Sequence, residues 1–259
     1  MILDDIVARK RIDVAARAEH ANLAELETSL AQRPPKRSLW HALDEEGVGV
    51  MAEIKRRSPS AGVFAKNVDP AAWAARYQDG GAIGISVLTD EPFFGGTHAD
   101  LRAARAAADL PVLQKDFVIN DYQIFEAAAA GADAVLLITG LTLDQDLAAQ
   151  ITLVHRLEME ALVEIHTEEE LDEALLAGAR IIGINNRNLR EFTTDLAVTE
   201  ELCKLIPEEI TVVSESGVHT AHDVERLAAA GVSGVLVGES IMKADDPRAQ
   251  LRMLVEAGE

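Results

Sequence analysis

Short apolar segments alternate with amphipathic helical patterns along most of the chain. Four stretches have nearly the same form, in which an Ala-rich helical stretch stops at a glycine and an apolar strand follows at once. These glycines are Gly81, Gly131, Gly178 and Gly231, separated by 50, 47 and 53 residues. Glycine suits the left-handed conformation that commonly ends a helix. Half of the spacing, about 25 residues, is the length of one strand–helix unit.

Further apolar runs between these four bring the predicted strands to eight. They lie near residues 48–55, 83–88, 111–115, 133–138, 159–164, 180–185, 210–215 and 233–238. A helical stretch follows each strand, which predicts a parallel sheet covered by helices. At this length a closed (βα)8 TIM barrel is favoured over an open doubly wound sheet. The first strand also lacks the following G-x-G-x-x-G motif of a dinucleotide-binding fold.

The predicted helix starts agree with this alternation. Asp69–Pro70 is typical of an N-cap followed by proline at the first helical position. Thr142–Gln145 and Thr167–Glu170 have the spacing of capping boxes, and Asn120–Gln123 resembles one.

The N-terminal segment has a different pattern. Residues 3–30 carry apolar positions at helical spacing with charges between them, which predicts one or two amphipathic helices ending before Pro34–Pro35. Chemically suggestive groups do not stand out there. We therefore expect residues 1–47 to be a helical extension that caps the barrel and residues 48–259 to be the barrel, within a single domain.

Composition narrows the class of protein. The chain has 259 residues, of which 48% are hydrophobic and 26% charged, and this fits a soluble globular protein. Its apolar runs are all shorter than the roughly eighteen residues of a membrane helix. The start, Met1–Asp5, has acids where a signal peptide needs basic residues. We therefore expect a cytoplasmic protein.

Charge and cysteine content exclude several functions. With 24 Lys and Arg against 44 Asp and Glu, the formal net charge is −20. Binding to nucleic acid or to an anionic membrane would need basic patches, so both are disfavoured. Cys203 is the only cysteine, which excludes disulfides and thiolate zinc sites within one chain. Its helical surroundings predict a small buried hydrophobe.

Polar side chains gather at the C-terminal ends of five predicted strands. Glu53 and Lys55 end the first strand, and strand alternation places both on one face. The other four ends carry Lys115-Asp-Phe117, Glu164, Asn185-Asn-Arg187 and Glu215-Ser-Gly217. Catalytic residues of (βα)8 barrels lie at these ends and come from several strands. The pattern therefore predicts an active site.

Small residues follow the last two predicted strands. Ser214–Gly217 and Gly238–Ser240 supply backbone N–H groups that could face a phosphate. Each turn by itself is ordinary. Phosphate in these barrels tends to bind on the loops after the last two strands and at a helix N-terminus, so the two turns together predict a phosphate site.

The residues alone leave several chemical roles open. Lys55 and Lys115 each suit a general acid, a Schiff-base nucleophile or an anion anchor. Glu53 and Glu164 are candidate bases, and Asn185 is a neutral hydrogen-bond donor.

The histidines do not predict a metal site or a Ser-His-Asp arrangement, because none of the seven closes a predicted strand. His219 and His222 are three residues apart at a helix start, where solvated side chains are the ordinary interpretation. His166 follows Glu164 by two residues but lacks a second imidazole partner. We therefore expect no metal ion.

Five motifs together resemble the indole-3-glycerol phosphate synthase family of tryptophan biosynthesis, over roughly residues 1–256. They are Ala52–Ser60, Leu113–Phe117, Leu162–Glu164, Ile184–Arg187 and Ser214–Gly217. The resemblance implies a (βα)8 barrel with an extra N-terminal helical segment over the active-site mouth. It also implies a carboxy-lyase, which closes the ring of 1-(2-carboxyphenylamino)-1-deoxyribulose 5-phosphate with loss of CO2 and water to give indole-3-glycerol phosphate. No cofactor or metal is implied.

The resemblance also implies catalytic roles. Lys115 would be the general acid that polarises the ketone, and Lys55 would hold the anthranilate carboxylate, with the division of steps between the two lysines left open. Glu164 would stabilise the developing cation or take a proton in the dehydration. Glu53 and Asn185 would orient Lys55 and the substrate hydroxyls.

Glu215 would contact the lysine network, and the remaining positions would bind substrate. The phosphate would lie against Ser58, Ser60, Arg187, Ser216, Gly217, Gly238, Glu239 and Ser240. The aromatic ring would lie in an apolar slot made by Phe94, Phe117, Leu136 and Leu236. Two positions depart from the family's pattern: Glu239 places an acid beside the phosphate loop, where its side chain must point away, and Asn188 stands where the family often has Asp.

Rival interpretations remain. Another phosphate-binding barrel enzyme, such as a sugar-phosphate isomerase or a Schiff-base aldolase, would use the same strand ends, whereas a non-catalytic binding barrel would not need them. We expect a small phosphorylated substrate, no nucleic-acid or membrane partner and no fused pathway domain. The sequence leaves the oligomeric state open, with a monomer as one option.

Overall fold

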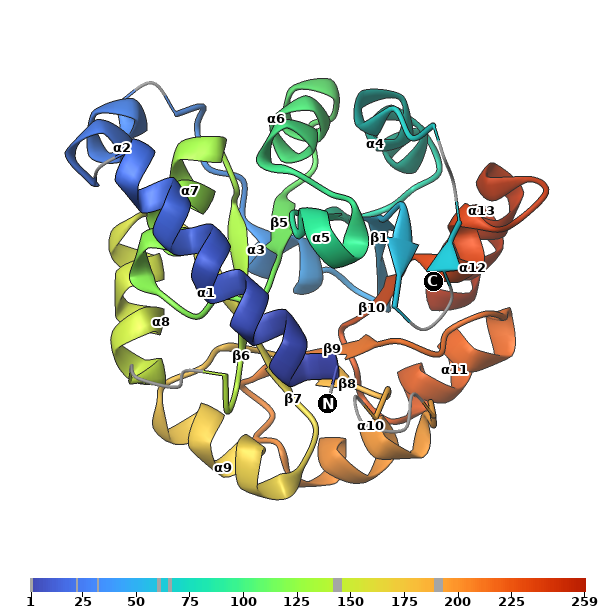
Figure 1. Cartoon of the computed structure of the whole chain (residues 1–259). Coiled ribbons are helices and arrows are strands. Elements are labelled where there is room, and N and C mark those ends of the chain that lie inside the picture. The colour runs from blue at the N-terminus through green and yellow to red at the C-terminus, as the bar shows by residue number, and fades with distance from the viewer. Residues whose placement is uncertain are drawn as a thin grey trace.

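The computed structural model of the chain describes residues 2–21, 23–31, 33–59, 62–64, 67–141, 146–188 and 193–259. Its centre is a closed barrel of eight parallel strands (Figure 1). In chain order these strands are β1 (Gly49–Ile54), β4 (Gly84–Leu88), β5 (Val112–Lys115), β6 (Ala134–Ile138), β7 (Glu160–Ile165), β8 (Ile181–Asn185), β9 (Thr211–Glu215) and β10 (Gly234–Val237). Strand β1 pairs with both β4 and β10, which closes the ring. The predicted (βα)8 barrel is confirmed.

Helices surround the strands on the outside. They are α4 (Pro70–Asp79), α6 (His98–Ala107), α7 (Asp121–Ala130), α8 (Leu147–Arg156), α9 (Glu168–Leu176), α10 (Ala197–Leu202), α11 (Ala221–Ala229) and α13 (Pro247–Gly258). The 3₁₀ turn Cys203–Leu205 follows α10, and there Cys203 is half-buried. Short elements extend the loops after three strands: the β2–β3 ribbon (Arg57–Ser58 with Gly62–Val63) after β1, α5 (Glu91–Phe94) after β4 and α12 (Glu239–Met242) after β10.

The ends of the helices follow the predicted local chemistry. The four repeat glycines all have left-handed φ values, between 84° and 91°. Asp69 caps α4, with its carboxylate accepting from two backbone N–H groups. The side chains of Asn120 and Thr167 cap α7 and α9, each accepting from one backbone N–H group. The predicted capping box at Thr142–Gln145 lies outside the described residues.

Strand alternation explains why the barrel mouth is polar. Val50, Ala52 and Ile54 of β1 point outward into the core between strands and helices, whereas Met51 points into the barrel interior. Glu53 and Lys55 continue the inward series of Met51, because strand side chains alternate in direction. Strands β5, β7 and β9 likewise carry an inward apolar residue two positions before a charged one. Each strand therefore changes from apolar to charged as it reaches the mouth.

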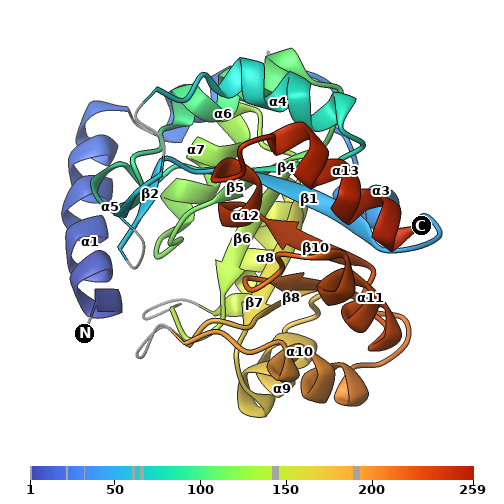
Figure 2. The same ribbon diagram turned by 90° about the vertical axis from the view of Figure 1, so that its right-hand side faces the viewer.

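The N-terminal segment lies at both ends of the barrel. Helix α1 (Ile2–His20) crosses the mouth, and α2 (Leu23–Leu30) packs near α7 (Figures 1 and 2). The predicted pair of helices before Pro34–Pro35 is confirmed. The unpredicted α3 (Leu39–Leu43) lies at the opposite end, where Leu39 and Leu43 are buried in the interior cluster (Figure 2). Within the described parts of the chain, helices long and apolar enough to cross a membrane are absent.

Candidate active site

A cavity opens at the C-terminal ends of the strands, with about 1190 Å³ of empty space when the solvent at its mouth is counted. The predicted site residues that line it are Glu53, Lys55, Ser58, Phe94, Lys115, Phe117, Leu136, Glu164, Asn185, Arg187, Glu215, Ser216, Gly217, Leu236, Gly238, Glu239 and Ser240. The remaining predicted residue, Ser60, lies outside the described residues. One cavity therefore collects side chains that are separated by up to nearly two hundred positions in the sequence.

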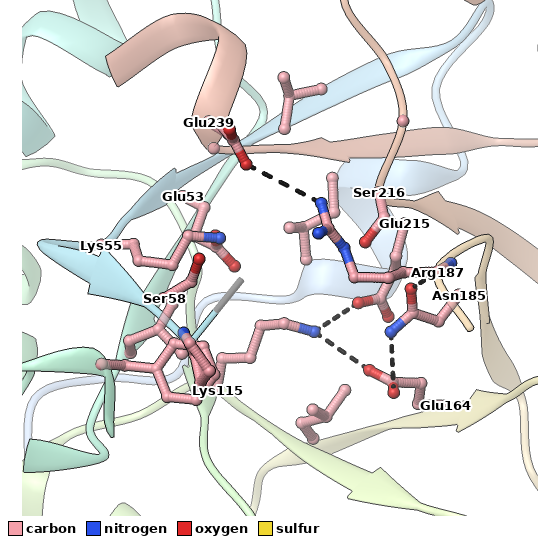
Figure 3. A pocket seen from close by; sticks show the side chains of 18 of the residues that line it. Glu53, Lys55, Ser58, Lys115, Glu164, Asn185, Arg187, Glu215, Ser216 and Glu239 are labelled. Atoms are coloured by element: carbon pink, nitrogen blue, oxygen red, sulfur yellow. Dashed lines mark hydrogen bonds and ion pairs between the residues drawn. The ribbon is translucent and has the colours of Figure 1, made fainter. Parts of the chain in front are cut away.

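Lys115 of β5 occupies the centre of the charged cluster (Figure 3). Its Nζ donates to Glu215 of β9 and lies 3.2 Å from Glu164 Oε2 of β7. The other oxygen of Glu164 accepts a 3.1 Å hydrogen bond from Asn185 Nδ2. Both carboxylates are at most 3% exposed. A single ammonium group thus bridges two buried carboxylates, while Asn185 from a fourth strand, β8, orients one of them.

The surroundings raise the pKa values of Lys115 and Glu215 and lower that of Glu164. Burial opposes the charged form of Lys115, but the charges of Glu215 and Glu164 overcome it and raise the lysine's pKa above its ordinary value. Burial raises the pKa of Glu215 to about 7, with the charge of Glu164 adding to the rise. Burial also opposes ionisation of Glu164, yet Lys115, His166 and Asn185 hold its pKa below the ordinary value. Lys115 is therefore held protonated and Glu164 ionised near neutral pH.

A second lysine faces the cavity from the end of β1. Lys55 Nζ forms an ion pair with Glu53, whose side chain is 2% exposed, and lies 5.7 Å from the centre of the Phe64 ring. Tyr77 of α4 donates a 2.9 Å hydrogen bond to the backbone carbonyl of Glu53. Lys55 is itself 17% exposed, so its ammonium remains accessible to an anion in the cavity.

Two glycines provide the space that these carboxylates occupy. A Cβ atom at Gly183 of β8 would collide with Glu215 Oε1, and one at Gly238 would collide with the carboxylate of Glu53. Gly183 was not among the predicted site residues. Its signal was a glycine inside a strand, a position that often marks close approach by another group.

The turns after β9 and β10 form the side of the cavity predicted to bind phosphate. Ser216 and Gly217 both have left-handed φ values, of 66° and 90°. Ser240 Oγ donates a 3.0 Å hydrogen bond to the carbonyl of Val218 and so joins the two turns. The carboxylate of Glu239 lies 2.7 Å from Lys243 Nζ and 3.8 Å from an Arg187 nitrogen. Glu239, which departs from the family's pattern beside this loop, is therefore paired with two cations, Lys243 and Arg187.

Apolar side chains form the opposite wall. The rings of Phe94 and Phe117 have centroids 6.0 Å apart and an interplanar angle of 36°. Leu136 and Leu236 line the same cavity, as predicted. The structure adds lining residues to which the sequence had given no role in the site: Leu3, Ile6, Pro59, Leu88, Asp116, Ile138, Val218, His219 and Val237. Leu3 and Ile6 show that helix α1 supplies part of the wall.

Buried charges next to the cavity were also missed from the sequence. Lys10 of α1 lies 2.7 Å from Asp90 and 2.6 Å from Asp116, and all three side chains are at most 2% exposed. His166, at the end of β7, has Nε2 3.5 Å from Glu164. The sequence predicted no chemical role for the segment that contains Lys10, and it suggested His166 only as a possible metal ligand.

The histidines considered as metal ligands are spread apart. His219 lines the cavity, while the side chain of His222 is 82% exposed. Among the described residues, a group of three or more His, Cys, Asp or Glu side chains placed to hold a metal ion is not found. The expected absence of a metal or cofactor remains a prediction.

Fold and site together define a (βα)8-barrel enzyme whose charged residues and small-residue turns meet at the C-terminal mouth. The sequence profile of the family described as indole-3-glycerol phosphate synthase matches residues 3–254. The chain belongs to this family. Relatives of that name from Kineococcus radiotolerans and Mycobacterium avium are each 46% identical, covering 99% of this chain and 96% and 94% of their own lengths. The relative from Rhodococcus jostii is 48% identical, with 99% and 96% covered.

Two solved structures with similar folds share much less sequence with this chain. A thiamine phosphate pyrophosphorylase from Pyrococcus furiosus is 17% identical with a TM-score of 0.61, covering 81% of this chain and 95% of its own. KGPDC from Streptococcus mutans is 16% identical with a TM-score of 0.63, covering 82% and 97%. At such low identity these similarities support the barrel fold alone.

Proposed function

We propose that this protein is an indole-3-glycerol phosphate synthase, which converts 1-(2-carboxyphenylamino)-1-deoxyribulose 5-phosphate into indole-3-glycerol phosphate, CO2 and water. The observation that carries the proposal is the Glu164–Lys115–Glu215 cluster beside Lys55 at the barrel mouth. A decarboxylating ring closure needs cations for a carboxylate and a phosphate, and a proton donor beside the ketone. This cavity offers both, next to an apolar wall for the aromatic ring.

In the first step Lys115 acts as the general acid. The ring carbon that bears the carboxylate attacks the ketone carbon, and the ketone oxygen takes a proton from the Lys115 ammonium. Lys55 holds the carboxylate in the attacking geometry. CO2 then leaves without its bonding electrons, which restore the aromatic ring. Glu164, ionised and buried, stabilises the positive charge that develops on the ring and nitrogen.

In the second step the new hydroxyl leaves as water. A lysine donates a proton to the departing oxygen, and Glu164 takes a proton from the forming indole ring. Across the whole reaction a carboxylate becomes neutral CO2, so each turnover consumes one proton. Asn185 holds Glu164 by its 3.1 Å hydrogen bond. Glu53 orients Lys55, and Glu215 orients Lys115.

The phosphate binds across the turns after β9 and β10. The small residues Ser216, Gly217 and Gly238 allow a phosphate to approach the backbone, and Arg187, two residues after β8, adds a positive charge. Ser58, after β1, completes this end, and the Glu239 and Ser240 amides donate to the phosphate. Ser60 is proposed to join them, although it lies outside the described residues. The aromatic ring then lies against Phe94, Phe117, Leu136 and Leu236.

The site gives less support to a lysine that forms a Schiff base with the substrate. A Schiff-base aldolase needs a lysine that loses its proton readily, and this requires a lowered pKa. The two carboxylates around Lys115 raise its pKa instead. A general acid suits that environment better than an amine nucleophile. Borohydride with substrate provides a direct check, because it would trap a Schiff base on Lys115 and so contradict the acid role.

Indole fluorescence tests the proposed reaction. Purified protein is mixed with the carboxyphenylamino-deoxyribulose phosphate without added metal or nucleotide. We expect indole emission to rise, because the product contains an indole ring and the substrate does not. A folded protein that produces no such emission would overturn the proposal and favour another phosphate-binding barrel enzyme.

We further propose that residues 1–47 act as a cap on the barrel and residues 48–259 as the catalytic barrel. We also propose a cytoplasmic monomer, in which one chain carries the whole site. A multiply charged phosphorylated substrate does not cross membranes unaided, which supports the location. Light scattering of the purified chain tests the assembly, and cell fractionation tests the location.

A further inference from the structure

The end of strand β7 carries a histidine that the proposed chemistry does not use. His166 follows Glu164 by two residues, and alternation points both toward the barrel mouth. Its Nε2 lies 3.5 Å from Glu164 Oε1, and its Nδ1 lies 3.2 Å from Glu170 Oε2. The side chain of Glu164 is 3% exposed, that of His166 18% and that of Glu170 29%. The imidazole therefore lies between a buried carboxylate of the site and a more exposed one on helix α9.

The contact with Glu170 fixes the orientation of the ring. Thr167 caps α9 by accepting the Glu170 N–H, as the capping-box spacing predicts. The carboxylate of Glu170 accepts from the backbone N–H of His166 at 2.5 Å and contacts ring Nδ1. With Nδ1–H donated to Glu170, ring Nε2 is directed at Glu164.

The charges that face the ring make it a proton carrier near neutral pH. Burial lowers the pKa of His166, but the hydrogen bond to Glu170 outweighs it together with the charges of Glu164, Glu170 and Glu215. The pKa is therefore raised above its ordinary value. These acids come from the strand itself, from α9 and from β9. An imidazole in this range can give a proton to the site and regain one from water.

We propose that His166 delivers protons from solvent to the buried Glu164–Lys115 pair during turnover. The inference rests on the proposed function, in which each turnover consumes one proton. Substrate in the cavity covers the face of Lys115 that would otherwise meet water. A route through His166 approaches the pair from the other side, along β7.

Each transfer in this route is balanced. The imidazolium passes its Nε2 proton to the Glu164 carboxylate, which leaves a neutral imidazole and a neutral carboxylic acid. Glu164 then passes that proton to Lys115 Nζ, 3.2 Å away, after the lysine has given its own to the substrate oxygen. This restores the ammonium and the carboxylate. Nε2 is buried where it faces Glu164, so the neutral imidazole regains its proton when the ring, 18% exposed, turns Nε2 out to water and then turns back. Solvent thereby loses one proton and substrate gains one.

Two substitutions separate proton delivery from simple hydrogen bonding. His166→Gln keeps an N–H donor near Glu164 but cannot carry a proton, and His166→Ala leaves space for free imidazole. We expect kcat to fall by about 10- to 100-fold in both variants, with little change in KM. Added imidazole should restore much of the turnover of His166→Ala and leave that of the wild-type enzyme unchanged. His222→Gln, on an exposed histidine of α11, is the matched control and should behave as wild type.

A further variant tests the same route without altering His166. Glu170→Gln removes the main contact that raises the pKa of His166, so the pH above which kcat declines should move downward. Its side-chain carbonyl can still accept the His166 backbone N–H. This variant keeps the test decisive if the substitutions at His166 impair folding.

Two results would overturn the role of His166. One is full turnover in His166→Gln, because a hydrogen bond alone would then suffice. The other is a slow His166→Ala enzyme that imidazole does not accelerate, together with an unmoved pH profile in Glu170→Gln. A wild-type protein that forms no indole product overturns the proposed function instead, so the two failures are distinguishable.

Discussion

Lys115 is held between two carboxylates that come from different strands, Glu164 from β7 and Glu215 from β9. Burying these charges costs desolvation energy, which the ion pairs offset only in part. Glu215, with a pKa raised to about 7, shows how strongly the site opposes a second negative charge. These residues therefore serve catalysis more than stability, and substitutions should lower turnover without an equal loss of stability.

Glu164→Gln is the clearest such substitution, because it keeps the size of the side chain and removes its charge. We expect kcat to fall by about 10²- to 10⁴-fold, as for loss of a general base. The thermal midpoint should change by less than about 3 °C, since a buried charge is removed along with its favourable contacts. Indole fluorescence and circular dichroism measure the two effects.

Glu160→Gln is the matched control on the same strand. Glu160 lies at the opposite end of β7, where it accepts 2.8 Å hydrogen bonds from Ser38 and from the backbone of Trp40. This variant should lose about 1–3 kcal/mol of stability and keep its kcat. If Glu164→Gln instead loses stability and keeps turnover, Glu164 has a structural role.

Gly183→Ala tests whether the missing side chain of Gly183 determines the position of Glu215. The added Cβ would collide with Glu215 Oε1, so the carboxylate must move away from Lys115. We expect kcat to fall by about 100-fold, the scale of a 1 Å misplacement in an active site. Gly84→Ala is the control, because the nearest atom to its Cβ would be 3.4 Å away, in a Leu39 side chain at the other end of the barrel. Equal turnover in the two variants would show that Gly183 does not matter to the site.

A buried charge cluster helps to hold helix α1 over the mouth, together with the Arg17–Glu126 ion pair near the helix end. Lys10 forms ion pairs with Asp90 and Asp116, which belong to the loops after β4 and β5. Asp90 also caps α5, which carries Phe94, and Asp116 accepts from the backbone N–H of Phe117. The cluster therefore connects the N-terminal helix to both aromatic rings of the cavity wall.

Lys10→Met should loosen this connection, because it leaves two buried carboxylates without their cation. We expect a loss of about 3–5 kcal/mol in the free energy of unfolding, and faster amide exchange in α1. KM for the substrate should rise as the Phe94–Phe117 wall becomes less ordered. Denaturant titration, hydrogen exchange and steady-state kinetics measure these three effects.

Two companion variants make the interpretation specific. Arg9→Met removes an ion pair whose arginine is 56% exposed, and it should change stability by less than about 0.5 kcal/mol. Adding Asp90→Asn and Asp116→Asn to Lys10→Met removes the stranded charges and should recover much of the lost stability. A Lys10→Met protein as stable as the wild type would mean that other contacts hold α1.

At the scale of the whole molecule, the repeated strand–helix pattern explains why the barrel strands could be predicted from the sequence. All eight strands were predicted within about two residues, because each apolar run is bounded by a helix-ending glycine or a charged strand end. The same pattern placed Lys115 and Glu164 at the ends of their strands, and alternation put Glu53 and Lys55 on one face of the first strand. Helix α3 was missed because its five residues are too short to show a helical period.

Contacts between distant segments could not be predicted in this way. Lys10 looked like any charged residue of an amphipathic helix, and only the crossing of α1 over the mouth brings it to Asp90 and Asp116. The role of Gly183 likewise depends on which side chain of the neighbouring strand points at it. Patterns along the chain predict elements and their faces, whereas partners depend on how the barrel closes.

The net charge of −20 leads to a last prediction, about the folded molecule as a whole. Surface acids in excess repel one another, and salt shortens that repulsion from a range of about 30 Å at 0.01 M to under 10 Å above 0.1 M. We expect the thermal midpoint to rise by at least about 3 °C between 0.01 and 0.5 M NaCl. The ion pairs of Lys10 and Lys115 are buried and barely screened, so the stability difference between wild type and Lys10→Met should stay constant with salt. A midpoint that falls with salt would mean that attractive surface pairs outweigh the excess negative charge.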